Sequence, residues 1–467
     1  MDLFGRRVIY SDVDEINAAN VLDVINRARV IHEKNKVEID FLYKYYRGDQ
    51  PILYRKKDIR PEICNKIVEN RANEVVSFKV GYLCGEPIQY ISRSGESSVA
   101  EQVGRLNDMM LVESKATKDK DLLEWQHIVG TAYRMVAVSA DEDAESPFEL
   151  YTLEPRNAFV IYSSKVGNKV LAGVHIGTNS EGETVYSLYT DRMFFEVTSI
   201  GPVKVEPHAL GFVPIIEYPA NSARMGAFET VIPILDAINT VTSNRIDGVE
   251  QFVQSLMKFI NCEIDKETFA TLQQMGAISI KSTDGQNADV EILTQELNQQ
   301  QTQTLVDYMY QTVLTICGMP NRNGNGSSTS DTGAASLLRD GWTLAEARAK
   351  DSELMFKRSE REMLKVVLRI CRTLAGMDLK LADVETKFTR RNYENIQTKA
   401  QVLCEMLNNP KIDPKLAFTH CGMFTDPEEA YQMSMKKYEE VQKKLEEQNK
   451  KANTDGNQPD VKQAEKP

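Results

Sequence analysis

The sequence predicts an α+β protein that is mainly helical. Two long amphipathic segments, residues 227–260 and 293–320, carry apolar side chains at three- and four-residue spacing, the period of a helix with one buried face. Residues 133–219 change to short alternating apolar runs separated by turn residues, which is typical of β-strands. The 467 residues are 42% hydrophobic and 27% charged, so two or three folded domains are expected.

Residues 1–226 are expected to form one α+β domain. Helical patterns cover residues 13–46, 61–80 and 98–130, and the β-like runs follow them. The acidic run at 141–145 lies between two β-like runs, so a solvated turn is its simplest interpretation. Carboxylates can also hold Mg²⁺, and a metal-dependent nuclease is therefore kept as an alternative.

A small insert is expected between the two long helices. The helix over 227–260 would be about 50 Å long at the helical rise per residue. Residues 261–292 would form a small α/β insert, in which 277–281 pairs with 289–293. The second helix, over 293–320, ends at a Gly-Met-Pro sequence that stops a helix. Two antiparallel helices cannot bury two such faces alone, so these faces need neighbours.

Two simpler interpretations of the long helices remain open. They fit an ordinary interior helix pair of a large domain. They also fit a helical cytosolic scaffold built on simple coiled coils. The interruptions at Pro233 and Gly341 argue against strict heptads.

A polar loop follows the helix pair at residues 321–333. It contains three glycines and a single cation, Arg322. A flexible surface linker is one interpretation. Between two long helices, such a loop could instead touch a phosphate backbone without binding it tightly. The candidate contact residues are Asn321, Arg322, Asn323, Gly324, Asn325, Gly326, Ser327, Ser328 and Thr329.

A long helix is expected after the loop, over residues 334–374. Glycine is a common kink site, so a bend is predicted at Gly341 and Trp342. A strand over 379–389 would complete this segment, which runs to residue 394.

The last part of the chain is expected to hold three helices within residues 395–450. Two of them begin at Asp-Pro pairs, at 413–414 and 426–427, which suit the cap and the first turn of a helix. Residues 451–467 are polar and are expected to be disordered, because they cannot bury a core.

Composition and motifs argue against several functional classes. A net charge of -12 and a pI near 5.2 disfavour tight phosphate binding, which depends on lysine and arginine. No Walker A, His-Glu-x-x-His, Gly-x-Ser-x-Gly or EF-hand motif occurs, and the five histidines and seven cysteines are scattered. No catalytic residue, metal ligand or cofactor is predicted. No apolar run is long enough for a membrane helix, so no membrane partner is expected.

Several short motifs, taken in their order along the chain, carry a family resemblance. They are Tyr45-Tyr46-Arg47-Gly48, the run Gly81 to Pro87, Gly130-Thr131-Ala132-Tyr133, the run Leu210 to Glu217, and the loop before Ala334. With the helix pair, they resemble the portal proteins of tailed bacteriophages, of the type found in siphophages of Gram-positive hosts. The resemblance covers residues 10–450.

The resemblance implies a structural, non-enzymatic role. Portal proteins form a ring of twelve subunits at one capsid vertex, through which double-stranded DNA is packaged and ejected. The implied partners are DNA, held weakly and without sequence preference, the terminase, the head-tail adaptor, and the scaffold and major capsid proteins. The implied location is the virion, after assembly in the host cytoplasm.

The resemblance also implies a role for each region. Residues 1–226 and 334–394 correspond to the wing, and 227–260 with 293–320 to the stem. The other regions are a clip at 261–292, with Lys266, Lys281 and Asp284 as partner contacts, a tunnel loop at 321–333 and a crown at 395–450.

Overall fold

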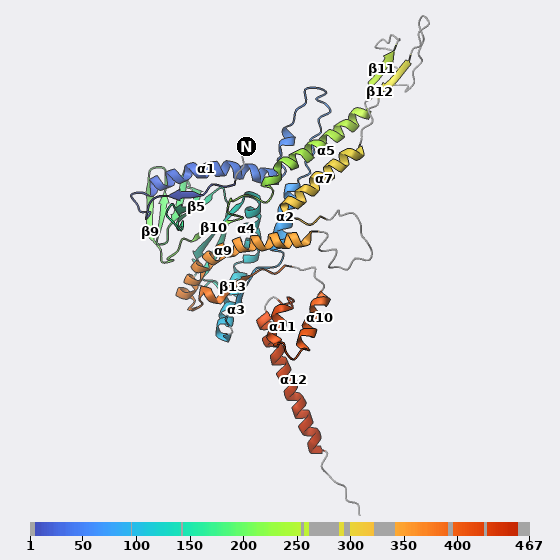
Figure 1. The fold of residues 1–467 in the computed structure, drawn as a ribbon. Coiled ribbons are helices and arrows are strands. Elements are labelled where there is room, and N and C mark those ends of the chain that lie inside the picture. The colour runs from blue at the N-terminus through green and yellow to red at the C-terminus, as the bar shows by residue number, and fades with distance from the viewer. Residues whose placement is uncertain are drawn as a thin grey trace, which may run out of the picture.

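The fold is α+β and mainly helical, which confirms the predicted fold class (Figure 1). The computed structural model describes residues 5–94, 96–141, 143–253, 256–260, 289–293, 299–321, 341–390, 396–424 and 427–455. A body of helices and sheets occupies the centre, a helix pair projects from one side of it, and a small helical unit lies on another side.

Helices dominate the first part of the body. They are α1 (Val21–Tyr46), the 3₁₀ helix η1 (Pro51–Tyr54), α2 (Arg71–Leu83), α3 (Ser97–Val112) and α4 (Lys115–Val129). The helix predicted from residue 13 begins only at Val21. The side chains of Asn17 and Asn20 bond to backbone N–H groups in this stretch and hold it as a turn.

Two larger sheets complete the body and confirm the β pattern predicted for residues 133–219. One has the order β1-β5-β6-β7-β8-β9, with β1 parallel to β5, and the other the order β10-β3-β4. The apolar face of α1 packs against the six-stranded sheet. The strands are β1 (Ile9–Ser11), β3 (Thr131–Val138), β4 (Phe148–Leu153), β5 (Ala158–Ser163), β6 (Val170–Thr178), β7 (Thr184–Tyr189), β8 (Met193–Val197), β9 (Pro202–Pro207) and β10 (Ile215–Pro219).

The projecting pair consists of α5 (Ile232–Val253), which follows the 3₁₀ helix η2 (Glu229–Val231), and α7 (Gln299–Cys317). Both helices are shorter than predicted. Strands β11 (Leu256–Ile260) and β12 (Asp289–Leu293) pair with each other beyond them.

The predicted partner of 289–293, residues 277–281, lies outside the described residues, so that pairing stays a prediction. What the structure corrects is residues 256–260, which were predicted as the end of a helix and form a strand. Apolar residues at 256, 257, 259 and 260 fit a helix and a buried strand equally well. Such a short run cannot be assigned by its period alone.

A second long helix, α9 (Trp342–Leu374), crosses the body. Gly341 is the N-cap of this helix. Residues 334–340 lie outside the described part, so the bend predicted at Gly341 stays a prediction. The strand predicted over 379–389 is shorter: the 3₁₀ helix η3 (Leu381–Asp383) leads into β13 (Val384–Lys387), which pairs with β2 (Gln89–Ser92).

The three predicted C-terminal helices form a separate small unit. They are α10 (Ile396–Leu407), α11 (Pro414–His420) and α12 (Pro427–Asp455). Asp413 caps α11 as predicted, since its carboxylate accepts a bond of 2.8 Å from the Lys415 N–H. α12 runs five residues past the predicted end at 450, and residues 456–467 lie outside the described part.

A buried cluster of charges joins the body at its centre. The Glu360 carboxylate on α9 lies 2.8 Å from the Lys115 Nζ and accepts hydrogen bonds of 2.6 and 2.7 Å from the hydroxyls of Tyr90 and Tyr218. Arg134 lies beside it, and Asp119 completes the cluster by pairing with both cations.

The electrostatics of this cluster favour the ionised carboxylate. Burial alone would raise the pKa of Glu360, but the neighbouring cations Lys115 and Arg134 outweigh it and hold that pKa below its ordinary value. Burial and the Glu360 charge raise the pKa values of Tyr90 and Tyr218, so both tyrosines stay protonated donors. The cluster therefore ties α9 to α4, β2, β3 and β10.

Replacing Glu360 by Gln should lower the free energy of unfolding by about 3–5 kcal/mol, because two buried cations lose a charged partner. Glu362 on the same helix is the matched control. Its side chain is exposed and, among the described residues, forms an ion pair with Lys365 alone, so Glu362→Gln should change stability by less than about 0.5 kcal/mol. Urea unfolding of both variants measures the difference. Equal effects would show that the cluster does not hold α9.

Candidate functional site at the base of the 322–340 segment

The end of α7 fixes where residues 322–340 leave the body. Gly318 adopts a φ of +66°, a left-handed conformation that suits glycine. Its N–H and that of Met319 donate to carbonyls in the last turn of α7, at 3.1 and 2.8 Å, which is the Schellman pattern of a helix end. The helix stop predicted at 318–320 is therefore confirmed.

The two flanks of this segment lie side by side. Gly341, at a φ of +81°, begins α9. A Cβ built on Gly341 would lie 3.7 Å from the Cα of Pro320 and 3.9 Å from the backbone nitrogen of Asn321. The chain thus leaves the body and returns to it at one point. Of the nine predicted loop residues, Asn321 is described and half-buried, whereas 322–329 lie outside the described residues.

Aromatic and charged side chains anchor the start of α9 at this point. The rings of Phe78 and Tyr82 on α2 stack at 5.6 Å, and Trp342 lies 6.2 and 5.9 Å from them. The Tyr82 hydroxyl donates to Glu346 at 2.9 Å, and Arg390 donates to the same carboxylate at 2.8 and 3.0 Å. The return of the chain is therefore held by α2.

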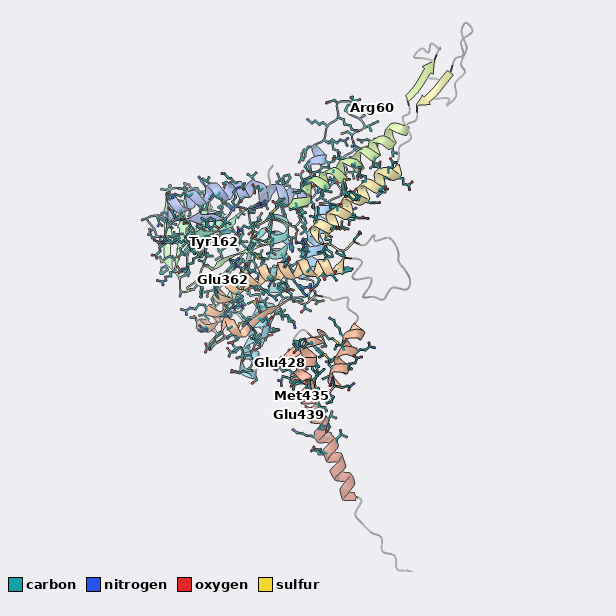
Figure 2. The ribbon with its side chains drawn as sticks, viewed as in Figure 1. Arg60, Tyr162, Glu362, Glu428, Met435 and Glu439 are labelled. Atoms are coloured by element: carbon teal, nitrogen blue, oxygen red, sulfur yellow. The ribbon has the colours of Figure 1, made fainter. Side chains whose placement is uncertain are left out.

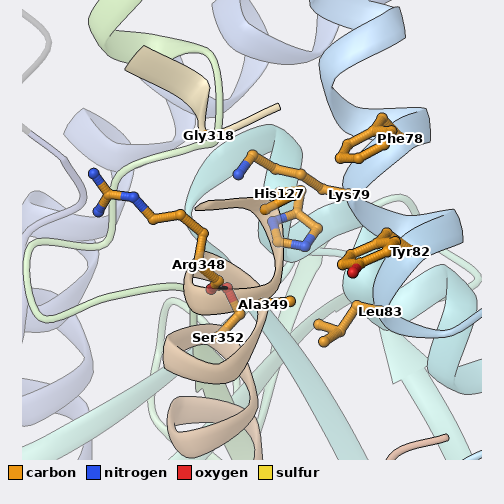
Figure 3. A pocket seen from close by; sticks show the side chains of 10 residues that line it. Phe78, Lys79, Tyr82, Leu83, His127, Gly318, Arg348, Ala349 and Ser352 are labelled. Atoms are coloured by element: carbon orange, nitrogen blue, oxygen red, sulfur yellow. Dashed lines mark hydrogen bonds between the residues drawn. The ribbon is translucent and has the colours of Figure 1, made fainter. Parts of the chain in front are cut away.

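A small cavity lies beneath the two flanks (Figure 3). Its volume is about 20 Å³, close to that of one water molecule, so no organic ligand fits. The His127 Nε2 is buried there without a hydrogen-bond partner in the described part of the chain. The lining residues are Phe78, Lys79, Tyr82, Leu83, His127, Gly318, Ala345, Arg348, Ala349 and Ser352.

Basic side chains of this cavity lie in a poorly solvated position. Burial, and then the Lys79 charge, lower the pKa of His127 to about 3, so the imidazole is neutral at pH 7. Burial lowers the pKa of Lys79 as well. Figure 3 shows the Lys79 and His127 side chains close together, while the Arg348 side chain extends away from them. The arrangement is a packed junction of α2, α4, α7 and α9.

A polar stripe on α5 holds an extended segment alongside that helix. Asn239, Ser243 and Asp247, here called the α5 stripe, lie four residues apart and so share one face. They accept bonds of 2.7 to 2.9 Å from the N–H groups of every second residue in the range Asn65–Glu69. Four helical residues rise about 6.0 Å and two extended residues about 6.6 Å, so the two periods match.

Asp247 ends the α5 stripe in an ionic contact. Arg55 Nη1 lies 3.3 Å from the Asp247 Oδ2, and the Lys57 ammonium group donates a hydrogen bond to the same oxygen. Burial opposes ionisation, but the bonds from Lys57 and from the extended segment outweigh it and lower the pKa of Asp247. The helix predicted over 61–80 begins only at Arg71, because the residues before it are held extended on α5.

One face of α7 is apolar and exposed. Leu305, Tyr308 and Ile316 share this face and are 49%, 68% and 45% exposed, and Ile246 and Val249 are exposed on α5. Between Gln299 and Cys317, the sole charged residue is Asp307. α7 therefore presents an almost uncharged surface with apolar side chains that the described part of the chain does not cover.

Several other predicted residues remain outside this site. Lys266, Lys281 and Asp284 lie outside the described part of the chain. Asp141, Asp143 and Glu145 are exposed on the turn between β3 and β4. Within the described ranges, no group of three or more His, Cys, Asp or Glu residues could hold a metal ion, so the nuclease alternative gains no support. In those same ranges no helix is long and apolar enough to cross a membrane.

The sequence reasoning missed the α5 stripe and the junction at Lys79 and His127. The stripe had a signal, because Asn239, Ser243 and Asp247 repeat at four-residue spacing and so place hydrogen-bonding side chains on one face of α5. The junction had none, since its residues come from four helices far apart in the chain.

The sequence matches a known protein family. The family model described as "Phage portal protein, SPP1 Gp6-like" matches residues 26–454. The chain belongs to this portal family. Among solved structures, a chain of the neck of an empty GTA particle, computed with C6 symmetry, is similar at a TM-score of 0.46 and 11% identity. That match covers 75% of this portal-family chain and 90% of the other chain. No curated protein matches significantly.

Replacing Gly318 by Ala should lower the free energy of unfolding by about 1–2 kcal/mol, because alanine is strained in the left-handed conformation. The added Cβ would also meet the Arg348 Cγ at 2.6 Å. Gly104→Ala is the control: this glycine is exposed in α3 with nothing within 4 Å, so alanine should stabilise by about 0.5–1 kcal/mol. Thermal unfolding gives both values. A change in stability of the same sign for both variants would contradict the left-handed conformation assigned to Gly318.

Proposed function

We propose that this portal-family protein forms a closed ring of twelve subunits at one capsid vertex and is the conduit for double-stranded DNA in packaging and ejection. The role is structural and not enzymatic. The family match carries the proposal. On this proposal the protein is a virion component assembled in the host cytoplasm, in a phage of the siphophage type that infects Gram-positive hosts. Its partners are the terminase, the head-tail adaptor, and the scaffold and major capsid proteins.

We propose for each region the role that the family resemblance implies. We assign the wing to residues 1–226 and 334–394, the stem to the α5 and α7 pair, and the tunnel loop to 321–333. The clip, at 261–292, would carry Lys266, Lys281 and Asp284 to the motor and the adaptor. The crown would be the helical unit at 395–450.

The uncovered face of α7 supports self-association. Leu305 and Tyr308 are large apolar side chains on a projecting helix, where water contact is unfavourable. The partner face in a ring is a different surface of the same chain, since a heterologous contact repeated by rotation closes into a ring. The exposed Ile246 and Val249 on α5 supply such a second apolar surface.

The last helix supports the same conclusion. α12 extends away from the body, and its side chains from Lys436 to Glu447 are exposed (Figure 2). Tyr438, Val441 and Leu445 form an exposed apolar seam at heptad spacing. The sequence Lys-Lys-x-Glu-Glu recurs at residues 436 and 443, which places lysines on one flank of the seam and glutamates on the other. Parallel neighbours in a ring would bring opposite charges together.

The low charge of α7 suits a DNA conduit. Each strong contact to a phosphate would hold a sliding duplex in place, because phosphate affinity grows with every lysine or arginine engaged. Apart from Asp307, the exposed polar side chains of α7 are neutral amides and hydroxyls. The predicted tunnel loop adds a single cation, Arg322. Weak and nonspecific contact with DNA is therefore expected.

The purified protein should form rings with an axial hole in negative-stain electron microscopy. Tyr308→Asp should reduce ring formation, because it places a charge in the apolar face that neighbours bury. Val166→Asp is the control, since Val166 is fully exposed on the turn between β5 and β6. Light scattering reports the mass of each variant. A wild-type protein that stays monomeric at micromolar concentration would refute the proposal.

Replacing both Gly324 and Gly326 by Pro should leave ring formation nearly unchanged and sharply reduce DNA packaging. Proline removes the backbone freedom that the loop needs to move against a passing duplex, while the helices carry the subunit contacts. Gel filtration tests whether the variant still forms rings, and a packaging assay on assembled procapsids tests whether DNA packaging falls. Normal packaging by these rings would show that residues 321–333 are only a linker.

A further inference from the structure

A groove lies along the C-terminal half of α9. Three cations of α9, Lys365, Arg369 and Arg372, line it together with apolar side chains from three separate segments. Its volume is about 370 Å³. The apolar lining residues are Leu210, Phe212, Leu368, Leu379 and Leu381. We call this feature the α9 groove.

The cations of the α9 groove belong to a longer basic stripe. Arg358 and Arg361 precede Lys365, Arg369 and Arg372 at steps of three or four residues, so all five share one face of α9. Fourteen residues of helix span about 21 Å. Residues 361–374 contain four cations and one carboxylate, Glu362, in a chain whose net charge is -12. The stripe is therefore a local reversal of the protein's charge.

Neighbouring carboxylates neutralise this stripe only in part. Lys365 pairs with Glu362 at 2.7 Å, and Arg372 lies 3.6 Å from the exposed Asp378. Such exposed pairs contribute little to stability. Among the described residues, Arg358, Arg361 and Arg369 form no ion pair.

Helix stability accounts for only the end of the stripe. Cations stabilise a helix C-terminus through the last turn alone, which covers Arg372 and not Lys365 or Arg361. Phe212 is 40% exposed at the groove, a position that water does not favour for a phenyl ring. The groove thus combines uncovered apolar surface with positive charge.

We propose that the α9 groove binds an acidic amphipathic segment of another protein. Leucine-type side chains of that segment would contact the Phe212 side of the groove, and its carboxylates would pair with Lys365, Arg369 and Arg372. A nucleic acid would use the cations but not the aliphatic lining, which favours a protein partner. The inference does not depend on ring assembly.

Two segments at the C-terminal end of the chain, α12 and residues 456–467, fit this groove less well. Residues 427–455 of α12 hold six lysines against seven acidic residues, so this helix is nearly neutral. Residues 456–467 contain one aliphatic residue of any size, Val461, and offer no apolar face. Complementary charge therefore favours a different, acidic protein.

Fluorescence anisotropy with the full-length protein tests the proposal. The probe is a labelled 18-residue peptide with leucines at helical spacing and glutamates on the other positions. It should bind the wild type, and Arg369→Glu with Arg372→Glu should weaken binding by about tenfold or more, because like charges then face each other. Phe212→Ala should also weaken it. Arg29→Glu with Lys34→Glu, two exposed cations on α1, makes the same change in net charge and should have no effect.

Each other outcome overturns the assignment. Equal binding to the wild type and to the Arg369/Arg372 variant would mean that the groove is not the site. Equal binding of a peptide in which glycines replace the leucines would remove the role of the apolar lining. Preference for a 20-base-pair duplex over the acidic peptide would make the stripe a nucleic-acid surface. Tight binding of a peptide with the sequence of residues 427–455 would make the partner a second copy of this chain.

Discussion

The position of α9 against α4, β2, β3 and β10 depends on the buried ion cluster at Glu360. These side chains are buried, so a lone charge there would be strongly unfavourable, and both cations and both carboxylates must be present together. The strands and helices that carry Lys115, Asp119 and Arg134 can pack only in the arrangement that brings these charges together. The cluster thus selects one packing of α9 across the sheets.

α9 then carries this constraint outward in two directions. Its first turn, at Trp342 and Glu346, receives the chain returning from residues 322–340. Its last turns present the cations of the α9 groove on the opposite side from the buried carboxylate. One helix therefore sets both the origin of the proposed tunnel loop and the proposed partner surface, and a shift of α9 would move both together.

Much of the fold was readable from the sequence because it rests on local periodicity. The amphipathic helices, the β region at 133–219, the stop at Gly318 and the cap at Asp413 all have short-range causes. The strand at 256–260 was misread as helix, since five apolar and basic residues carry no decisive period. The extended segment before Arg71 was misread because its partners, on α5, are about 180 residues away.

The candidate site was less predictable than the fold. The tunnel loop is proposed from composition, because glycine and small polar residues between helices are a local signal. The ion cluster was not, since Glu360 stands in a Ser-Glu-Arg-Glu run that resembles an ordinary exposed helix surface. Burial of a single carboxylate is decided by tertiary packing, which spacing along one helix does not encode.

The α5 stripe fixes which residues of the extended segment lie against α5, because its three acceptors are spaced like every second N–H group of that segment. Each step of the α5 stripe differs from the extended spacing by about 0.6 Å, so the agreement lasts for a few steps only and three bonds are close to its limit. If the extended segment moved by one residue along α5, its carbonyl groups would face the α5 stripe in place of its N–H groups. A shift of two residues would set one N–H against Leu235 or Gln251. Insertions and deletions should therefore accumulate on either side of residues 65–69 and be excluded within them.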